Sequence, residues 1–370
     1  MKIGVPRERK TLEKRVAITP DGAQDLVRRG HGVLIETRAG EGAAFSDEEY
    51  RSAGAKIVDS LEAVWTQSEM VVKVKEPHEL EYQYFRPGLF LFDYLHLASM
   101  PEVAKALVDG GVTGIAYELV MDKQGRLPLL EPMSEIAGKL SVLNGSFYLL
   151  SQNQGRGVLL SGAVGVPRAQ VTIVGAGISG RAACEIAFGM GAHVSIFDIN
   201  TQKLEHLRAE FGNQITTAFS TPAALGRALE TTDLLIGAVL VPGAAAPKVI
   251  SREMISRMPN GSVFVDISID QGGCAETSRP TSLDEPTYLE NGVVHYGVCN
   301  MPAQTARTST MALTNATLPY IVRLAEKGPI EAMKNDAVIR GALNTHKGKL
   351  TNAKVSEAVG IDYSPIDEVL

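Results

Sequence analysis

The sequence predicts an α/β fold with two doubly wound parallel-sheet domains joined by long helices. Short runs of β-branched residues alternate with helical patterns, and this alternation occurs in two series along the chain. Strands separated by helices pair in parallel, because each helix returns the chain to the starting edge of the sheet. The length of 370 residues also suits about two domains of ~150 residues each.

The first series covers residues 1 to about 128. A helix is expected after Thr19, which offers an N-cap oxygen, with Pro20 at the first helical position and Gly30 as its stop. A second helix should follow Ser46, because acidic residues fill its first turn. The strands expected in this series are 2–5, 33–37, 70–73, 89–92 and 112–116.

The second series begins near residue 170 and lies between two long helical patterns, 134–150 and about 305–327. The later helix should return the chain to the first domain. We therefore expect a discontinuous first domain, 1–128 and 306–370, with residues 129–305 inserted into it. The strands expected in the inserted domain are 171–174, 194–198, 234–238, 263–267 and 293–298.

Composition excludes several classes of protein. Apolar residues make up 45% and charged residues 21%, which is typical of a packed protein rather than a disordered one. The net charge of −6, without a stripe of Lys and Arg, argues against nucleic acid as a partner. The most apolar window, 234–249, is too short to span a membrane, so no membrane partner is expected.

Cysteine usage and the N-terminus predict a cytoplasmic protein without a structural metal. Cys184, Cys274 and Cys299 form neither a disulfide framework nor a Cys/His ligand cluster. Charged residues within the first eight positions occupy the place where a secretion signal needs its apolar core.

A glycine-rich turn follows the first strand of the inserted domain. Gly175, Gly177 and Gly180 have the spacing Gly-x-Gly-x-x-Gly between a strand pattern and a helix pattern. The first permits a tight turn, the second lets the backbone approach a pyrophosphate, and the third lets the helix pack on the strand. N–H groups at the helix start, where Ile178 follows, would bind the anion. The motif predicts a Rossmann-type dinucleotide site.

Asp198 indicates which dinucleotide binds. It ends the next expected strand, 23 residues after Gly175 (198 − 175), near the ~20-residue interval at which a carboxylate meets the adenosine ribose hydroxyls. Its charge would repel a ribose 2′-phosphate, so the sequence favours NAD over NADP. In the alternative interpretation, Asp198 only caps the turn at Asn200 and Thr201.

Three ionisable residues follow expected strands of the first domain, at the edge where doubly wound sheets bind ligands: Arg15, Lys75 and His96. A guanidinium beside an ammonium suits a small carboxylate with a neighbouring carbonyl. The imidazole can transfer protons near neutral pH. Alternatively, Arg15 and Lys75 pair with Glu13 and Glu76 at the surface, and His96 is a satisfied core residue.

Asp270 follows a buried strand of the inserted domain, on the edge that carries the glycine turn. There it would face the nicotinamide end of a cofactor and could orient a water or an ammonium. The alternative is a turn-forming role before Gly272. The remaining histidines are expected to be solvated: His31, His78, His193, His206, His295 and His346.

The chain resembles the alanine dehydrogenase and pyridine nucleotide transhydrogenase family along its full length. The segments that carry the resemblance are GVPRE (4–8), RVAITP (15–20), KVKEP (73–77), YLHLA (94–98), the glycine turn, DIN (198–200), GAVLVPG (237–243), VDISIDQGG (265–273) and CNMP (299–302). The resemblance implies that Arg15 and Lys75 bind pyruvate or alanine, that His96 transfers protons, and that Asp270 is a second catalytic residue. It further implies NAD as cofactor, ammonia as the other product, and assembly as a homohexamer.

The resemblance also implies a set of cofactor contacts beyond the glycine turn and Asp198. These are Ser134, Lys203, Ser220, Val239, Leu240, Ile267, Arg279, Val298, Asn300 and Met301. Two departures from the family are visible. Related sequences usually carry Asn-Glu shortly before the arginine, whereas this chain has Leu12-Glu13. Near Glu326-Lys327 it also lacks the Glu/His pair with which some relatives hold a divalent ion, so no metal is expected.

Three other functions remain open from the sequence. The chain is also similar to the soluble nucleotide-binding subunit of a proton-translocating transhydrogenase, which need not keep a substrate pocket. Opine-type and saccharopine-type dehydrogenases share the architecture but need room for a larger amine. A non-catalytic NAD sensor would be expected to have lost one of the catalytic side chains, and all of them are present.

Overall fold

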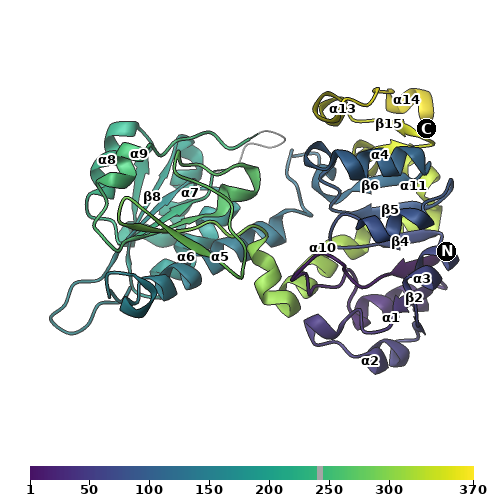
Figure 1. Cartoon of the computed structure of the whole chain (residues 1–370), viewed down its shortest axis with the longest axis horizontal. Helices are drawn as coiled ribbons and strands as arrows, with labels where there is room; N and C mark the ends of the chain where they lie inside the picture. The colour runs from purple at the N-terminus through teal and green to yellow at the C-terminus, as the bar shows by residue number, and fades with distance from the viewer. Residues whose placement is uncertain (240–244) are drawn as a thin grey trace. The chain divides into compact units, whose positions relative to one another are not determined.

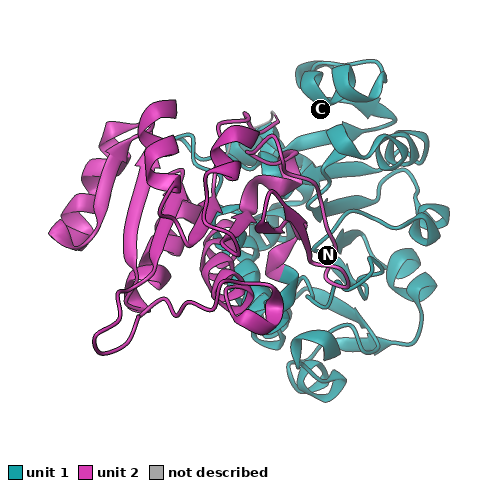
Figure 2. Cartoon of the chain, turned by 60° about the vertical axis from the view of Figure 1, so that its left-hand side comes forward, with its two compact units in different colours: residues 1–133, 303–370 teal, residues 134–302 magenta. Residues whose placement is uncertain are grey.

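The computed structural model describes residues 1–239 and 245–370, and it divides into two compact units (Figure 2). Unit 1 consists of Met1–Met133 and Ala303–Leu370, and unit 2 of Ser134–Pro302. The sequence placed the corresponding boundaries at 128/129 and 305/306. Within the described ranges, no helix is long and apolar enough to cross a membrane.

Unit 1 contains a sheet with the strand order β15-β14-β6-β5-β4-β1-β2-β3 (Figure 1). Strands β1 to β6 pair in parallel, whereas β14 and β15 pair antiparallel. The chain winds outward from β1 to β3 and then crosses to β4, so the winding reverses between β1 and β4. The strands are β1 (Lys2–Val5), β2 (Gly32–Glu36), β3 (Lys56–Val58), β4 (Met70–Val72), β5 (Phe90–Asp93), β6 (Thr113–Ala116), β14 (Leu343–His346) and β15 (Lys349–Leu350).

The helices of unit 1 begin and end at local sequence signals. In α1, the Thr19 hydroxyl accepts the N–H of Gly22, Pro20 is the first helical residue, and Gly30 follows the C-cap with φ of 85°. Ser46 and Glu49 form a capping box at the start of α2. The helices are α1 (Pro20–Arg28), α2 (Asp47–Ser52), α3 (Leu61–Gln67), α4 (Pro101–Asp109), α10 (Ala306–Lys327), α11 (Pro329–Asn335), α12 (Ala337–Gly341), α13 (Ala353–Val359) and α14 (Ile366–Val369).

Unit 2 contains a second sheet with the order β12-β13-β11-β10-β7-β8-β9. Its neighbouring strands are parallel except β12 and β13, and the winding reverses between β7 and β10. The strands are β7 (Gln170–Val174), β8 (His193–Asp198), β9 (Thr216–Phe219), β10 (Leu234–Gly237), β11 (Val263–Asp266), β12 (Thr287–Glu290) and β13 (Val293–Tyr296). The helices are α5 (Glu131–Tyr148), which begins in unit 1, α6 (Ile178–Gly189), α7 (Thr201–Phe211), α8 (Pro222–Leu229) and α9 (Arg252–Ser256).

Every strand expected from the sequence is present, with no end shifted by more than two residues, and the fold class is confirmed. The sequence missed β3, β9, β12, β14 and β15, which are two to four residues long and show little alternation of apolar and polar residues.

The expectation that the remaining histidines are solvated was wrong for two of them. His295 lies in β13 and is 1% exposed, and His346 lies in β14 and is 2% exposed. Each ring shares a hydrogen bond of 2.9 Å with a threonine hydroxyl, from Thr277 and Thr113 respectively. Burial lowers the pKa of both imidazoles, which favours the neutral form of each ring.

Unit 1 also contains a buried ionic cluster, formed by Glu8, Lys73, Glu81 and Asp93. The Lys73 Nζ lies 3.1 Å from Glu81 Oε1 and 3.3 Å from Glu8 Oε2. Burial opposes the charge of Lys73, but Glu8 and Glu81 outweigh it and keep its pKa above the ordinary value. Among the described residues, neither carboxylate oxygen of Asp93 has a hydrogen-bond partner, and burial raises the pKa of this group well above its usual range.

Glu8 should make the stability of the protein depend on pH. Burial raises the pKa of its carboxyl from 4.5 to about 7, so between these values the folded chain holds a proton that the unfolded chain has released. The free energy of unfolding should therefore fall as pH rises through this window, by on the order of 3 kcal/mol. Glu8→Gln is neutral throughout and keeps an acceptor for the N–H of Val74, so its unfolding midpoint should fall less between pH 5 and pH 8.

Glu62→Gln is the matched control, because Glu62 is an exposed carboxylate on α3 of the same unit. Circular dichroism at each pH gives the midpoints. If the Glu8→Gln and wild-type curves run parallel from pH 5 to pH 8, Glu8 does not titrate in this window.

Candidate active site

The carboxyl ends of β1, β4 and β5 lead to the three residues expected to meet a substrate. Arg15 follows β1, Lys75 follows β4 and His96 follows β5, and the winding of the sheet reverses between β1 and β4. Parallel strands end on one edge of their sheet, so these loops lie along a single edge of unit 1. This is the edge at which doubly wound sheets bind ligands.

Arg15 is held by an ion pair inside unit 1. The residue is 2% exposed, its Nε donates to Glu13 Oε1 at 2.7 Å, and its Nη2 donates to Glu13 Oε2 at 2.5 Å. Burial opposes the guanidinium charge, but Glu13 outweighs it and holds the pKa of Arg15 above its ordinary value. Arg15 does pair with Glu13, but the pair is buried and not at the surface, and a bidentate pair of this kind fixes the plane of the guanidinium.

The loop before Arg15 contains the departure from the family noted in the sequence. Leu12 has φ of 63°, in the left-handed region that asparagine and glycine tolerate and that costs other residues ~1 kcal/mol. In this chain the turn places Glu13 in contact with Arg15 without an asparagine at that position.

Lys75 and Glu76 form a looser contact. The Lys75 Nζ lies 3.9 Å from Glu76 Oε2, and Lys10 donates to the other carboxylate oxygen at 2.5 Å. Burial raises the pKa of Glu76, but the two ammonium groups outweigh it and leave the pKa below its ordinary value. Glu76 is thus an ionised carboxylate that keeps Lys75 near the sheet edge.

His96 lies in a turn immediately before a short 3-10 helix, η3 (Leu97–Ser99). Its side chain is 35% exposed, so it is not the satisfied core residue of the alternative interpretation. The imidazole stacks on the Tyr94 ring, with centroids 5.7 Å apart and an interplanar angle of 7°. Its backbone N–H donates to Glu118 Oε1 at 2.6 Å.

The glycine turn in unit 2 has the conformation that its spacing predicts. Gly175 has φ of 106°, which other residues rarely adopt, and a Cβ at Gly180 would collide with the Gly175 carbonyl oxygen. A Cβ at Gly177 would meet none of the described residues within 4 Å, so they leave the backbone there open to a ligand. Gly177 is also the N-cap of α6, and within the described ranges no side chain caps this helix, which leaves its first N–H groups suited to an anion.

Asp198, at the end of β8, has two backbone partners. Its Oδ2 accepts the N–H of Ala176 in the glycine turn at 2.6 Å, and its Oδ1 accepts the N–H of Asn200 at 2.7 Å. The turn-capping role is therefore present, and the same carboxylate also ties β8 to the phosphate-binding turn. Lys203 follows in the first turn of α7.

Asp270 and Asp266 have different roles in the segment after β11. Asp270 is exposed in η7 (Ile267–Gln271) and accepts the N–H of Asn300 at 3.2 Å. Asp266 is buried and accepts the N–H groups of Ser268 at 3.0 Å and Cys274 at 2.9 Å. Sequence reasoning missed Asp266. Its position as a carboxylate inside an apolar strand was the available signal.

Hydrogen bonds link several other expected cofactor residues to these strand ends. The N–H of Ser220 donates to the Asp198 carbonyl at 3.0 Å, and the N–H of Val239 donates to Ser268 Oγ at 3.0 Å, next to Ile267. Leu240 lies outside the described residues.

The remaining expected cofactor residues lie on three further segments of unit 2. Ser134 is one helical turn before Gly138, whose Cα packs against the backbone of Ser179 in the glycine turn. The Arg279 guanidinium lies 4.0 Å from the centre of the Tyr288 ring. Val298 and Asn300 precede a short 3-10 helix that starts at Met301.

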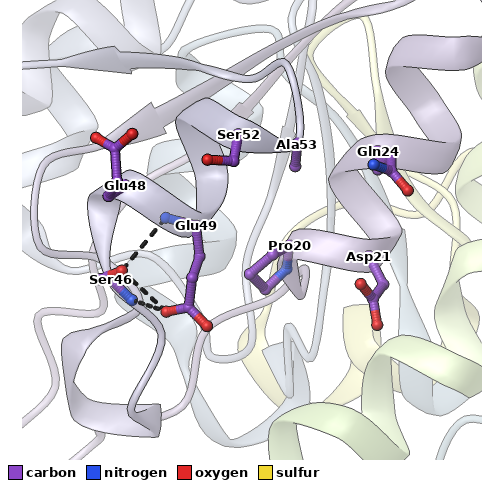
Figure 3. Close-up of a pocket in the computed structure, with 8 residues that line it drawn as sticks. All are labelled: Pro20, Asp21, Gln24, Ser46, Glu48, Glu49, Ser52 and Ala53. Atoms are coloured by element: carbon purple, nitrogen blue, oxygen red, sulfur yellow. Dashed lines mark hydrogen bonds between the residues drawn. The ribbon is translucent and has the colours of Figure 1, made fainter.

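Two further features lie outside this set of residues. A hollow of about 360 Å³ between α1 and α2 is lined by Pro20, Asp21, Gln24, Ser46, Glu48, Glu49, Ser52 and Ala53, none of which is a predicted site residue (Figure 3). In the part of the chain that the structure describes, no three His, Cys, Asp or Glu side chains are grouped so that they could hold a metal ion.

The chain is similar to known proteins over nearly its whole length. Residues 4–137 match the family model "Alanine dehydrogenase/PNT, N-terminal domain", and residues 141–353 match "Alanine dehydrogenase/PNT, C-terminal domain". The chain is 49% identical over 371 residues to alanine dehydrogenase 2 of Staphylococcus aureus strain USA300, with 100% of each chain covered. It is 50% identical over 363 residues to alanine dehydrogenase of Halomonas elongata, with 98% of each covered.

Solved structures also resemble this chain. A structure of L-alanine dehydrogenase matches with a TM-score of 0.95 and 47% identity, covering 97% of this chain and 99% of the other. A transhydrogenase structure from Sinorhizobium meliloti shares the fold, with a TM-score of 0.80 and 24% identity over 95% and 99% of the two chains. The chain therefore belongs to the alanine dehydrogenase/PNT family.

Proposed function

We propose that the chain is an L-alanine dehydrogenase, which catalyses the reversible NAD-dependent conversion of L-alanine and water to pyruvate and ammonium. The observation that carries the proposal is that Arg15, Lys75 and His96 follow neighbouring parallel strands at one edge of unit 1. Membership in the family and full-length identity to two alanine dehydrogenases support it. The chain is an amino-acid dehydrogenase and therefore an oxidoreductase.

Arg15 and Lys75 bind the α-carboxylate of alanine or pyruvate in this proposal. Glu13 holds the Nε and Nη2 side of the guanidinium, so a substrate carboxylate would approach the Nη1 and Nη2 end. Because Glu13 offsets the charge of Arg15, Lys75 would contribute much of the net attraction for the anion. The Met133 thioether, which accepts from Arg15 Nη1, is a weakly polar neighbour suited to a small side chain.

Unit 2 has the features that a dinucleotide requires. The open backbone at Gly177 and the uncapped start of α6, at Ile178, fit a pyrophosphate, and Asp198 fits the ribose hydroxyls. The expected contacts at Ser134, Gly175, Gly180, Lys203, Ser220, Val239, Leu240, Ile267, Arg279, Val298, Asn300 and Met301 would complete the site. A nicotinamide dinucleotide held by these residues would supply the acceptor for the hydride of the substrate Cα.

His96 and Asp270 handle the protons of the reaction. Loss of a proton from the α-ammonium group and of hydride from Cα leaves an iminium on the substrate. Water adds to give a carbinolamine, which loses its hydroxyl proton and expels ammonia to form pyruvate. His96 would accept the proton of the attacking water and return it to the departing nitrogen, while Asp270 orients the water or the ammonium. Alignment of the bound groups, which contributes ~7 to 11 kcal/mol in well-oriented reactions, outweighs this acid–base help of ~10² to 10⁴-fold.

The activity is tested by NADH oxidation with pyruvate plus ammonium and with pyruvate alone. We expect NADH oxidation only when pyruvate and ammonium are both present, because the reductive direction reduces the iminium that forms from the two. His96→Ala should lower turnover by ~10² to 10⁴-fold and leave the NADH dissociation constant unchanged, since the substitution lies in unit 1. Equal rates without ammonium, rates only with a larger amine, or hydride transfer only to a second nicotinamide nucleotide would each contradict the proposal.

Asp198 should determine the preference for NADH over NADPH. Asp198→Ala removes both the acceptor for the ribose hydroxyls and the charge that repels a 2′-phosphate. We therefore expect kcat/KM for NADH to fall, and the ratio of kcat/KM for NADH to kcat/KM for NADPH to fall by ~10-fold or more. Asp284→Ala, at an exposed loop aspartate of the same unit, is the control. An unchanged ratio would assign Asp198 to the turn alone.

We also propose that the protein acts in the cytoplasm, with no nucleic-acid or membrane partner.

We propose further that the chain assembles as a homohexamer. Leu143 and Phe147, one turn apart on α5, are 51% and 52% exposed, which suits burial against another copy. Sedimentation equilibrium should give about six times the chain mass of 39.6 kDa, and Phe147→Asp should lower it, whereas Leu80→Asp at an exposed site of unit 1 should not. A monomeric wild type would exclude the hexamer.

A further inference from the structure

Glu118 connects the strand next to β5 with the turn that carries His96. It lies in a short 3-10 helix, η4 (Tyr117–Leu119), directly after β6. Its Oε2 accepts the N–H of Leu95 at 3.2 Å and its Oε1 accepts the N–H of His96 at 2.6 Å. Because β5 and β6 are paired with Asp93 opposite Ala116, the carboxylate reaches these amides from the neighbouring strand.

The turn at His96 needs such support. His96 has φ of 49°, a left-handed conformation that is unfavourable for a residue with a side chain. One carboxylate accepting two successive N–H groups stabilises that backbone geometry. The Tyr94 ring, stacked on the imidazole, restricts the ring from one face, and the Tyr94 hydroxyl is itself bound to the Leu129 carbonyl oxygen.

Glu118 also acts on the imidazole itself. Its Oε1 lies 4.0 Å from His96 Nδ1, while the Glu118 side chain is 15% exposed. A carboxylate on this side favours a proton on Nδ1, by Coulomb attraction, and therefore makes Nε2 the nitrogen that exchanges protons with the substrate. The charge of Glu118 thus selects the nitrogen that reacts, and its two backbone hydrogen bonds hold the turn from which the imidazole extends.

We propose that Glu118 is a positioning residue for the proton transfer by His96, an inference that rests on the proposed function. Glu118 does not contact the reacting atoms in this role. It acts through His96, so its contribution to the rate should depend on the imidazole being present.

Glu118→Gln tests the charge, because the amide oxygen can still accept a backbone N–H. We expect kcat for pyruvate reduction with ammonium to fall by ~10 to 100-fold, with little change in the KM for pyruvate, the NADH dissociation constant or the thermal midpoint. Glu118→Asp, which keeps the charge on a shorter side chain, should retain more activity than Glu118→Gln. Glu102→Gln, at an exposed carboxylate on α4, is the control and should match the wild type.

A double-mutant cycle separates this role from a general structural one. In the His96→Ala background, Glu118→Gln should lower the residual turnover by less than twofold, because the group through which it acts is gone. An equal loss in both backgrounds, wild-type kcat in Glu118→Gln, or higher activity with Gln than with Asp would overturn the inference. These outcomes are read against an active wild type, whereas absence of ammonium-dependent activity in the wild type would overturn the proposed function instead.

Discussion

The substrate-binding and catalytic candidates and the glycine turn of this protein depend on one constraint, which is that parallel strands finish on the same edge of their sheet. In unit 1 the winding reverses between β1 and β4, and in unit 2 between β7 and β10, so the loops after these strands diverge to opposite faces and leave backbone uncovered between them. Arg15, Lys75 and His96 in one unit, and the glycine turn and Asp270 in the other, all follow strands at such an edge. The order of the strands thus determines where these loops lie, and the side chains on the loops determine which ligands and reactions they suit.

A second requirement follows from placing charged groups at the end of a buried sheet. Burying a guanidinium to 2% exposure removes its hydration at a cost in free energy, and the carboxylate of Glu13 offsets that cost for Arg15. The same rule explains Glu8 and Glu81 around Lys73, two residues before Lys75 on the same segment. Unit 1 therefore contains two buried clusters in which carboxylates compensate a cation. Removing Glu13 would take away an ion-pair partner of Arg15, whereas Lys73 would keep one carboxylate after loss of either Glu8 or Glu81.

How far the sequence predicts this arrangement depends on how local each signal is. Thr19, Pro20 and Gly30 define α1 by their own backbone and side-chain properties, and the glycine turn was recognisable for the same reason. Glu118 and His295 gave no such signal, because their partners His96 and Thr277 lie on other segments of the chain. Asp266 did give a local signal, as a carboxylate inside an apolar strand, but the residue pattern does not show that it pairs with Cys274. A pattern of residue types does not contain these pairings. They become visible only when strand order and register are known.

Asp266 shows how one buried carboxylate can organise several residues that were predicted separately. It accepts N–H groups of Ser268 and Cys274 and the Ser278 hydroxyl, which closes the segment from η7 to the residue before Arg279 into a single loop. Ser268 in turn accepts the N–H of Val239 after the neighbouring strand β10. Residues from two strand ends are thereby held in one network. Hydrogen bonds of this kind restrict the conformations of the loop, and a restricted loop loses less entropy when it binds a ligand.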